Sequence, residues 1–162
     1  MGGMSDLPHH PGPQDTDPLT ALAPGHRLAR GVARSFTDLG WSCLFEVSLK
    51  SGRRVDVMAL DGKGRIAVVE VKSSLADYRS DQKWQEYLEF CDLFYFAVPE
   101  DFPREVLPSE PGLIITDSFQ AAIVRESPST PLAAARRKAL TLRFARLAGS
   151  RLLQAIDPHL SP

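Results

Sequence analysis

An acid and a lysine stand two residues apart at the end of a short apolar segment of this 162-residue chain, Ile66-Ala67-Val68-Val69-Glu70-Val71-Lys72. The segment's β-branched residues predict a strand. Because alternate side chains of a strand share a face, Glu70 and Lys72 can bind a cation and orient a water together. The same acid-x-Lys spacing occurs at Asp61–Lys63 and Asp81–Lys83, in a predicted turn and at a predicted helix start. The tripeptide alone is therefore weak evidence.

A second acid, Asp56, interrupts the preceding apolar segment, Val55–Leu60. The Asp61-Gly62-Lys63-Gly64 sequence that follows is typical of a hairpin with a three-residue loop ending in glycine. That register pairs Asp61 with Arg65 and therefore Asp56 with Glu70, with the two side chains on one face about 5 Å apart. A slip of one residue would put them on opposite faces.

Two carboxylates this close repel each other unless a cation lies between them. Lys72 can offset part of the repulsion, and a divalent metal can offset more. Mg²⁺ typically takes one or two carboxylates together with waters and substrate phosphates. We therefore expect Asp56 and Glu70 to bind Mg²⁺ or Mn²⁺. The alternative is an ion-paired patch on an exposed strand face, without a chemical role.

Three helices are expected around these strands. The first runs from about Gly25 to Leu39, with Gly40 as its C-terminal stop. The second runs from about Ser80 to Cys91. The third follows Thr130-Pro131, an N-cap and first residue, and runs to about Ala148. The apolar faces expected for the first two helices are Leu28, Val32, Phe36 and Leu39, and Trp84, Tyr87, Leu88 and Cys91.

The strands predict an α/β fold in which a mixed sheet is flanked by helices. Three strands joined by short turns are largely antiparallel, whereas a helix between the third and fourth permits a parallel crossover. Two further strands and a helix are expected as C-terminal additions. The expected strands are Trp41–Leu49, Val55–Leu60, Arg65–Lys72, Leu93–Val98, Gly112–Thr116 and Gln120–Arg125.

Length and composition suit a single domain, with 43% hydrophobic and 24% charged residues. Residues 1–24 are rich in proline and are expected to form a disordered arm, residues 25–156 the domain, and residues 157–162 a tail. No apolar run reaches the ~20 residues needed to cross a bilayer, and no signal-peptide pattern is visible. A cytoplasmic, nucleoid-associated protein with no membrane partner is expected.

The net charge of −1 gives no overall signature of a nucleic-acid-binding protein, but basic residues gather near the two ends of the predicted domain. We expect the first and last helices to hold the DNA backbone, with binding that weakens steeply with salt. The alternative is an ordinary solvated helix surface. The candidate DNA-binding residues are Arg27, Arg30, Arg34, Arg54, Arg136, Arg143 and Arg146.

The chain resembles the PD-(D/E)XK phosphodiesterase pattern in two segments, Val55-Asp56-Val57 and Val69-Glu70-Val71-Lys72-Ser73-Ser74. Valine precedes Asp56 where the pattern has proline. Three further segments resemble the MmcB-like bacterial DNA-repair family: Gly52–Asp56, Asp77–Tyr87 and Cys91–Pro99. The resemblance covers about residues 25–125 and implies a restriction-endonuclease-like αβββαβ core.

By this resemblance Asp56 and Glu70 match the metal-binding acids and Lys72 the catalytic lysine, and the Val71 carbonyl would be a further metal ligand. Glu46, in the first strand, is a possible additional acid, although a surface glutamate explains it equally well.

Lys83 and Tyr87 lie four residues apart on the expected second helix, where related nucleases often place a polar residue in the site. Lys83 is therefore a candidate catalytic residue, whereas Tyr87 fits the core better because it shares a face with Trp84.

The function implied is that of a DNA-repair protein which hydrolyses DNA phosphodiester bonds with Mg²⁺ or Mn²⁺, with DNA and other repair proteins as partners. Lys72 would orient the attacking water or stabilise the transition state. A different reading is a catalytically silent module of the same fold that binds DNA or a repair protein. Metal-dependent cleavage of RNA is a third, against which no residue argues.

Overall fold

The computed structural model describes residues 22–159. Most of the arm expected at 1–24 and the last part of the expected tail lie outside these residues. The elements in chain order are α1 (Pro24–Asp38), β1 (Ser42–Ser48), β2 (Arg54–Leu60), β3 (Ile66–Val71), α2 (Leu75–Ser80), the 3₁₀ helix η2 (Trp84–Phe90), β4 (Leu93–Val98), the 3₁₀ helix η3 (Arg104–Val106), β5 (Gly112–Thr116), β6 (Ala121–Arg125) and α3 (Ala134–Ile156).

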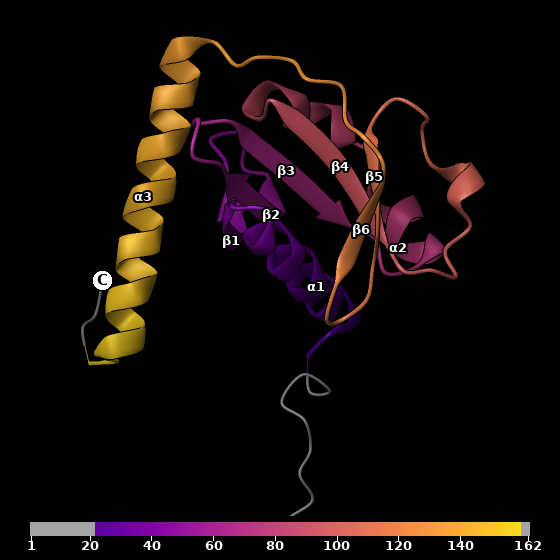
Figure 1. Ribbon diagram of the computed structural model, residues 1–162, viewed down its shortest axis with the longest axis horizontal. Helices are drawn as coiled ribbons and strands as arrows, with labels where there is room; N and C mark the ends of the chain where they lie inside the picture. The colour runs from indigo at the N-terminus through magenta and orange to yellow at the C-terminus, as the bar shows by residue number, and fades with distance from the viewer. Residues whose placement is uncertain (1–21, 160–162) are drawn as a thin grey trace, which may run out of the picture.

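The six strands form one mixed sheet in chain order, β1-β2-β3-β4-β5-β6 (Figure 1). The β1–β2 and β2–β3 pairs are antiparallel, β3–β4 and β4–β5 are parallel, and β5–β6 is antiparallel. The predicted α/β class is therefore confirmed. Because β3, β4 and β5 run in one direction, their carboxyl ends meet at one edge of the sheet, where ligands of α/β proteins commonly bind.

The hairpin between β2 and β3 has the predicted register, with Val57 opposite Val69 and Leu60 opposite Ile66. The Asp61 carboxylate fixes the turn by accepting hydrogen bonds from the Lys63 and Arg65 backbone N–H groups at 2.9 and 2.8 Å. Gly64 has a φ of +79°, which only glycine adopts readily. Continued by one residue, this register brings Asp56 opposite Glu70.

Helix α1 covers one face of the sheet with Ala29, Val32 and Phe36. Its C-terminus has the predicted glycine stop: the Gly40 N–H donates to the Thr37 carbonyl and the Trp41 N–H to the Phe36 carbonyl, the two bonds of a Schellman motif. Leu39 was expected on the buried face and is instead 64% exposed, because it lies in the non-helical cap.

The helix expected from Ser80 to Cys91 is wrong. Helix α2 lies earlier in the chain and begins after the N-cap Ser74. It ends at Ser80, because the next residue, Asp81, has an extended backbone. The 3₁₀ helix η2 follows, and its period of three residues places Trp84, Tyr87 and Phe90 against the second face of the sheet. Leu88 was expected on that face and is 43% exposed.

The last helix also differs from its prediction. Thr130-Pro131 does not start α3: the Thr130 N–H donates to the Asp92 carbonyl, and residues 126–133 form neither a helix nor a strand. Helix α3 begins at Ala134, runs to Ile156 rather than Ala148, and lies beside the β1 edge of the sheet (Figure 1).

Asp92 is the buried anchor of this C-terminal part. Its carboxylate accepts hydrogen bonds from the Ile66 and Leu132 backbone N–H groups at 2.8 and 3.0 Å. It also makes a two-point ion pair with Arg137 of α3, at 2.7 and 2.6 Å. The Asp92 side chain is 3% exposed, so its charge depends on these donors.

We predict that Arg137→Ala lowers the free energy of unfolding by about 3 kcal/mol, because it leaves a buried carboxylate without its counter-charge. Urea unfolding followed by circular dichroism measures the loss. The matched control is Arg136→Ala on the same helix, whose pair with Glu89 is exposed and should contribute less than about 1 kcal/mol. Equal losses in the two variants would contradict the assignment of Asp92 as the anchor.

Candidate metal centre

Asp56 lies where β1 and β2 depart from regular strand geometry. Val55 packs with the residues under η2 and Val57 with those under α1, although residues two apart on a regular strand share a face. The β1–β2 pairing passes from Phe45–Val57 to Val47–Val55, and Glu46 between them has a φ of +54°. Such left-handed backbone at a non-glycine residue is strained and persists where the surrounding structure enforces it.

The two predicted acids are held together at this point. Asp56 Oδ2 accepts a hydrogen bond from the Val71 N–H at 2.7 Å. Glu70 Oε1 lies 3.4 Å from the Asp56 backbone nitrogen, which donates to it. Each carboxylate therefore contacts the backbone of the other's strand. The Lys72 ammonium stands 4.0 Å from Glu70 Oε2, and the Glu70 and Lys72 side chains are 6% and 8% exposed.

The negative charge of these two acids is only partly compensated. Burial raises the pKa of Glu70 to about 8; the neighbouring Asp56 carboxylate contributes to this shift and Lys72 opposes it. The pKa of Asp56 is also raised, mainly by burial, against the Val71 N–H and Lys72. One lysine therefore compensates the two carboxylates only in part, which is the condition under which a further cation is stabilised.

The segment after β3 fixes the backbone around Lys72. Ser74 Oγ accepts from the Asp77 N–H at 3.1 Å, and Asp77 Oδ2 accepts from the Ser73 N–H at 2.9 Å. This reciprocal cap begins α2 immediately beyond the strand. The Lys72 N–H donates to the Ala97 carbonyl on β4, so the backbone on both sides of the lysine is held.

The acids and Lys72 face a cleft of about 560 Å³. Its walls come from the N-terminus of α1, the β1–β2 turn, the end of β3 and α2. At the rim Glu46 pairs with His26 at 3.2 Å and with Arg54 at 2.8 Å. Arg53 pairs with Asp81 at 3.1 Å and Glu86 at 2.6 Å, and so ties the β1–β2 turn to η2.

The donor set fits a hard divalent cation. Asp56 and Glu70 offer carboxylate oxygens only, and Mg²⁺ typically takes one or two such groups. Within residues 22–159 no three His, Cys, Asp or Glu side chains gather as a metal-binding group. The two acids alone would therefore be the side-chain ligands. Glu46 has other partners, and its role and that of the Val71 carbonyl as metal ligands remain predictions.

The structure does not bring Lys83 into the cleft. Lys83 is exposed at the start of η2, and its N–H donates to Asp81 Oδ1. The expected neighbourhood of Lys83 and Tyr87 fails because residues four apart do not share a face of a 3₁₀ helix. Tyr87 is buried as expected, and its hydroxyl donates to the Arg54 carbonyl at 3.3 Å at the cleft wall.

The candidate DNA-binding arginines of α1 and the β1–β2 hairpin surround the site. Arg54 lines the cleft, Arg30 lines a small cavity that also touches Asp56, and Arg27 lines a further cavity beside it. Arg34 instead lies over the Phe119 ring, 5.7 Å from its centre.

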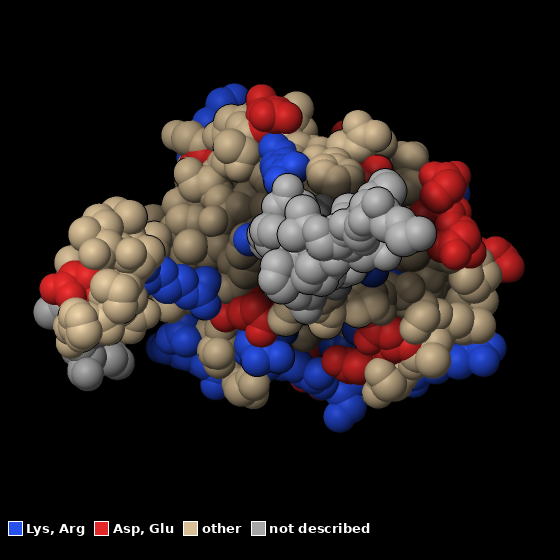
Figure 2. All heavy atoms as spheres, turned by 90° about the horizontal axis from the view of Figure 1, so that it is seen from below, with Lys and Arg blue, Asp and Glu red and all other residues tan. Residues whose placement is uncertain are grey.

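The arginines of α3 have different surroundings. Arg136 pairs with Glu89, whereas Arg143 and Arg146 line a separate groove of about 960 Å³ with Lys50. Seen from the end at which α1 begins, basic and acidic side chains are interspersed rather than gathered into one basic field (Figure 2). DNA binding by these arginines remains a prediction.

Four residues that line the cleft are not predicted from the sequence: His26, Arg53, Asp77 and Asp81. His26 and Arg53 carry no local signal, because they reach the site only when α1 and the β1–β2 turn pack beside β3. Asp77 has one: Ser74-x-x-Asp77 is a helix N-cap pattern. Asp81 was counted only as part of an acid-x-Lys match.

The fold and site are those of an α/β protein in which a buried acid and lysine, Glu70 and Lys72, lie at the carboxyl end of the central strand β3, next to the half-buried Asp56 of β2. A family model described as DNA repair protein MmcB-like matches residues 19–159, and the chain belongs to that family. No match was found among curated proteins. No helix in residues 22–159 is both long and apolar enough to cross a membrane.

One solved structure is similar over nearly its whole length. It is the SPO1766 protein of unknown function from Silicibacter pomeroyi, with 49% sequence identity and a TM-score of 0.86 over 88% of this chain and 97% of that one. A repair endonuclease from Pyrococcus abyssi is 24% identical over 37% of this chain and 30% of its own, with a TM-score of 0.27. At that score the overlap is no evidence of a shared fold.

We predict that Glu70→Gln stabilises the metal-free protein at alkaline pH. Because the folded state holds the Glu70 proton up to a pKa of about 8, against an ordinary 4.5, folding loses stability as pH rises between these values. Glutamine removes the charge and keeps an oxygen acceptor for the Asp56 N–H. Denaturant unfolding in EDTA should give equal stabilities at pH 4.5 and a gain of about 2–4 kcal/mol for the variant at pH 9. A variant less stable by the same amount at both pH values would contradict the burial of an excess charge.

Proposed function

We propose that this protein hydrolyses phosphodiester bonds of DNA with a bound Mg²⁺ or Mn²⁺, on a restriction-endonuclease-like αβββαβ core. The observation that carries the proposal is the pair of the half-buried Asp56 and the buried Glu70, with the buried Lys72 beside Glu70, in an accessible cleft. The order α1, β1–β3, α2, β4 is compatible with that core. The description of the family as DNA repair proteins supports DNA as the substrate.

In this mechanism Asp56 and Glu70 would hold the metal, which would supply Lewis-acid activation of water and positive charge for the scissile phosphate. Lys72 is held at the cleft floor, where its ammonium orients the attacking water and stabilises the developing negative charge. Arg54 and His26 stand at the rim, where they hold the flanking phosphates. The cytoplasmic nucleoid is the compartment in which this substrate is available.

Metal binding is tested without any cleavage assay. We predict that Mn²⁺, followed by electron paramagnetic resonance, binds the parent and that its affinity rises between pH 6 and pH 8.5, because the metal must displace the proton held by Glu70. Asp56→Asn should weaken binding by at least about tenfold through loss of one charged ligand. Glu105→Gln, an exposed acid of η3 that lines neither the cleft nor the neighbouring cavity, is the control and should bind like the parent. Equal affinity of Asp56→Asn and the parent would remove Asp56 from the ligand set.

Catalysis is tested with single-stranded, nicked and branched DNA and with RNA of the same sequence, in Mg²⁺ or Mn²⁺. We predict cleavage by the parent, and losses of at least about 100-fold in Lys72→Met and Asp56→Asn, the size seen when one electrostatic donor is removed. Methionine preserves the packing of the buried lysine stem. Lys63→Met is the matched control, because Lys63 belongs to an equivalent acid-x-Lys tripeptide in the exposed β2–β3 turn.

The outcomes separate the candidate functions. If the folded parent binds DNA and cuts nothing, the protein is the silent binding module. If the parent cuts RNA in preference to DNA, the substrate is corrected and the site retained. If Lys72→Met cuts as well as the parent, the assignment of the site is wrong.

A further inference from the structure

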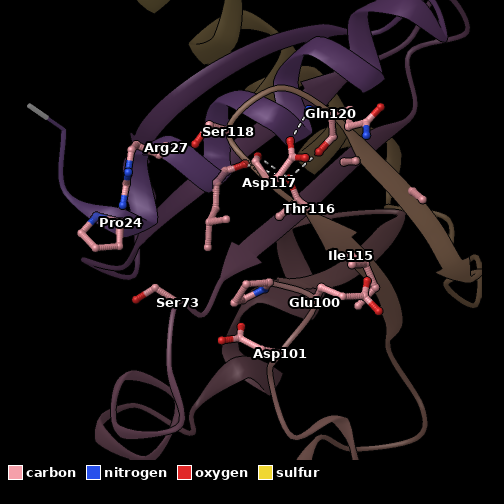
Figure 3. A pocket seen from close by; sticks show the side chains of 14 residues that line it. Pro24, Arg27, Ser73, Glu100, Asp101, Ile115, Thr116, Asp117, Ser118 and Gln120 are labelled. Atoms are coloured by element: carbon pink, nitrogen blue, oxygen red, sulfur yellow. Dashed lines mark hydrogen bonds between the residues drawn. The ribbon is translucent and has the colours of Figure 1, made fainter. Parts of the chain in front are cut away.

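A second cavity, of about 650 Å³, adjoins the candidate metal centre. It lies between the first turn of α1 and the carboxyl ends of β4 and β5 (Figure 3). Pro24 and Ser73 line both this cavity and the metal cleft. A strand of nucleic acid whose phosphate lies at Lys72 can therefore continue past Ser73 into it. Its volume falls in the range of small-molecule sites, about 300–1,000 Å³.

The two sides of this cavity carry opposite charge. Arg27 of α1 lies on one side, and Glu100 and Asp101 lie on the other, beyond the end of β4 (Figure 3). The Arg27 Nε is shielded from solvent and has no hydrogen-bond acceptor within the described residues. A buried donor left unpaired is destabilising. A ligand that brings an acceptor to Arg27 removes that destabilisation.

Most other polar groups of the cavity already have partners. The Asp117 carboxylate accepts from the Phe119 and Gln120 backbone N–H groups at 2.7 and 2.8 Å. Glu100 pairs with Arg104 at 2.7 Å. Asp101, by contrast, makes no side-chain hydrogen bond or ion pair with another described residue. Arg27 and Asp101 are therefore the two charged groups of the cavity with free capacity for a ligand among the described residues, beside the neutral side chains of Ser118 and Gln120.

We infer that this cavity is a subsite for one nucleotide of the DNA strand, next to the scissile phosphodiester. Arg27 binds its phosphate, and the Asp101 carboxylate accepts hydrogen bonds from the edge of its base. This rests on the proposed function in taking DNA as the ligand of the cleft. A bare anion fits less well, because the acidic side would repel it. A nucleotide instead carries its negative phosphate at one end and the hydrogen-bond donors of its base at the other.

The acidic side also predicts which base is preferred. Guanine presents two adjacent donors, its ring N–H and its exocyclic amino group, which match the two oxygens of one carboxylate. Thymine presents a single N–H between two carbonyl oxygens, and those oxygens meet the carboxylate unfavourably. The subsite should therefore favour guanine over thymine through Asp101, and hold the phosphate of either through Arg27.

The test is binding of mononucleotides to the full chain in EDTA, followed by titration calorimetry and NMR. The probes are dGMP, TMP, 2-deoxyribose 5-phosphate and inorganic phosphate. We expect dGMP to bind about fivefold more tightly than TMP, the worth of one hydrogen bond. Arg27→Gln should weaken all the phosphate-bearing probes by about tenfold, the worth of a charged hydrogen bond. Asp101→Asn should abolish the preference for dGMP. The controls are Arg79→Gln and Asp38→Asn, exposed charges outside the cavity.

The absence of saturable binding by any mononucleotide, or an Arg27→Gln protein that binds like Arg79→Gln, would overturn the subsite. If inorganic phosphate binds as tightly as dGMP and Asp101→Asn changes nothing, recognition of the base is overturned. These measurements involve neither metal nor cleavage. A protein that binds dGMP through Arg27 and cuts no DNA would refute the hydrolysis alone, whereas one that cuts DNA without binding nucleotides here would refute the subsite alone.

Discussion

The pairing register of β2 with β3 is the constraint on which the candidate site depends. Asp56 and Glu70 are far apart along the chain, and one residue of slip would send them to opposite faces of the sheet. The Asp61 carboxylate and Gly64 fix the turn between the strands, and the apolar pairs from Val57–Val69 to Leu60–Ile66 hold the register. A short exposed turn thus decides whether two acids meet at the opposite end of the hairpin.

The charges of two acidic centres, one at each end of β3, are compensated to different extents. Asp92 has a two-point ion pair with Arg137 and two backbone donors, so its charge is compensated and it anchors α3. At the other end of β3, Asp56 and Glu70 share one lysine at 4.0 Å from Glu70. Burial without full compensation is destabilising by itself, and this is the usual mark of a group kept for binding or chemistry.

The first turn of α1 joins the regions where a ligand would lie. Pro24 lines both the metal cleft and the neighbouring cavity, His26 reaches Glu46 at the rim, and Arg27 turns into the cavity. No acidic residue of α1 occupies this turn and no side chain caps it, and Glu46 of β1 is the carboxylate paired with it, through His26. The arrangement suits a ligand that carries several negative charges along its length.

The sequence by itself determined the elements whose signals are local. Alternating and continuous apolar runs located all six strands, the glycine turn gave the hairpin register, and Gly40 ended α1 where expected. From these alone the meeting of Asp56, Glu70 and Lys72 could be predicted, because strand periodicity and turn chemistry act over a few residues. The prediction of the second helix failed, because an α-helical period puts Trp84, Tyr87, Leu88 and Cys91 on one face. The structure instead has a 3₁₀ helix, whose period of three packs Trp84, Tyr87 and Phe90 into the core.

Only the tertiary structure decided what surrounds the acids. Lys83 lies outside the site because η2 is a 3₁₀ helix. Helix α3 begins later than predicted because the segment before it is hydrogen-bonded to Asp92. His26, Arg53 and Arg27 reached the two cavities through the docking of α1 and the β1–β2 turn beside β3. Contacts of this kind join residues 20 or more positions apart. They depend on which surfaces can be buried together, and no local pattern in the chain records that.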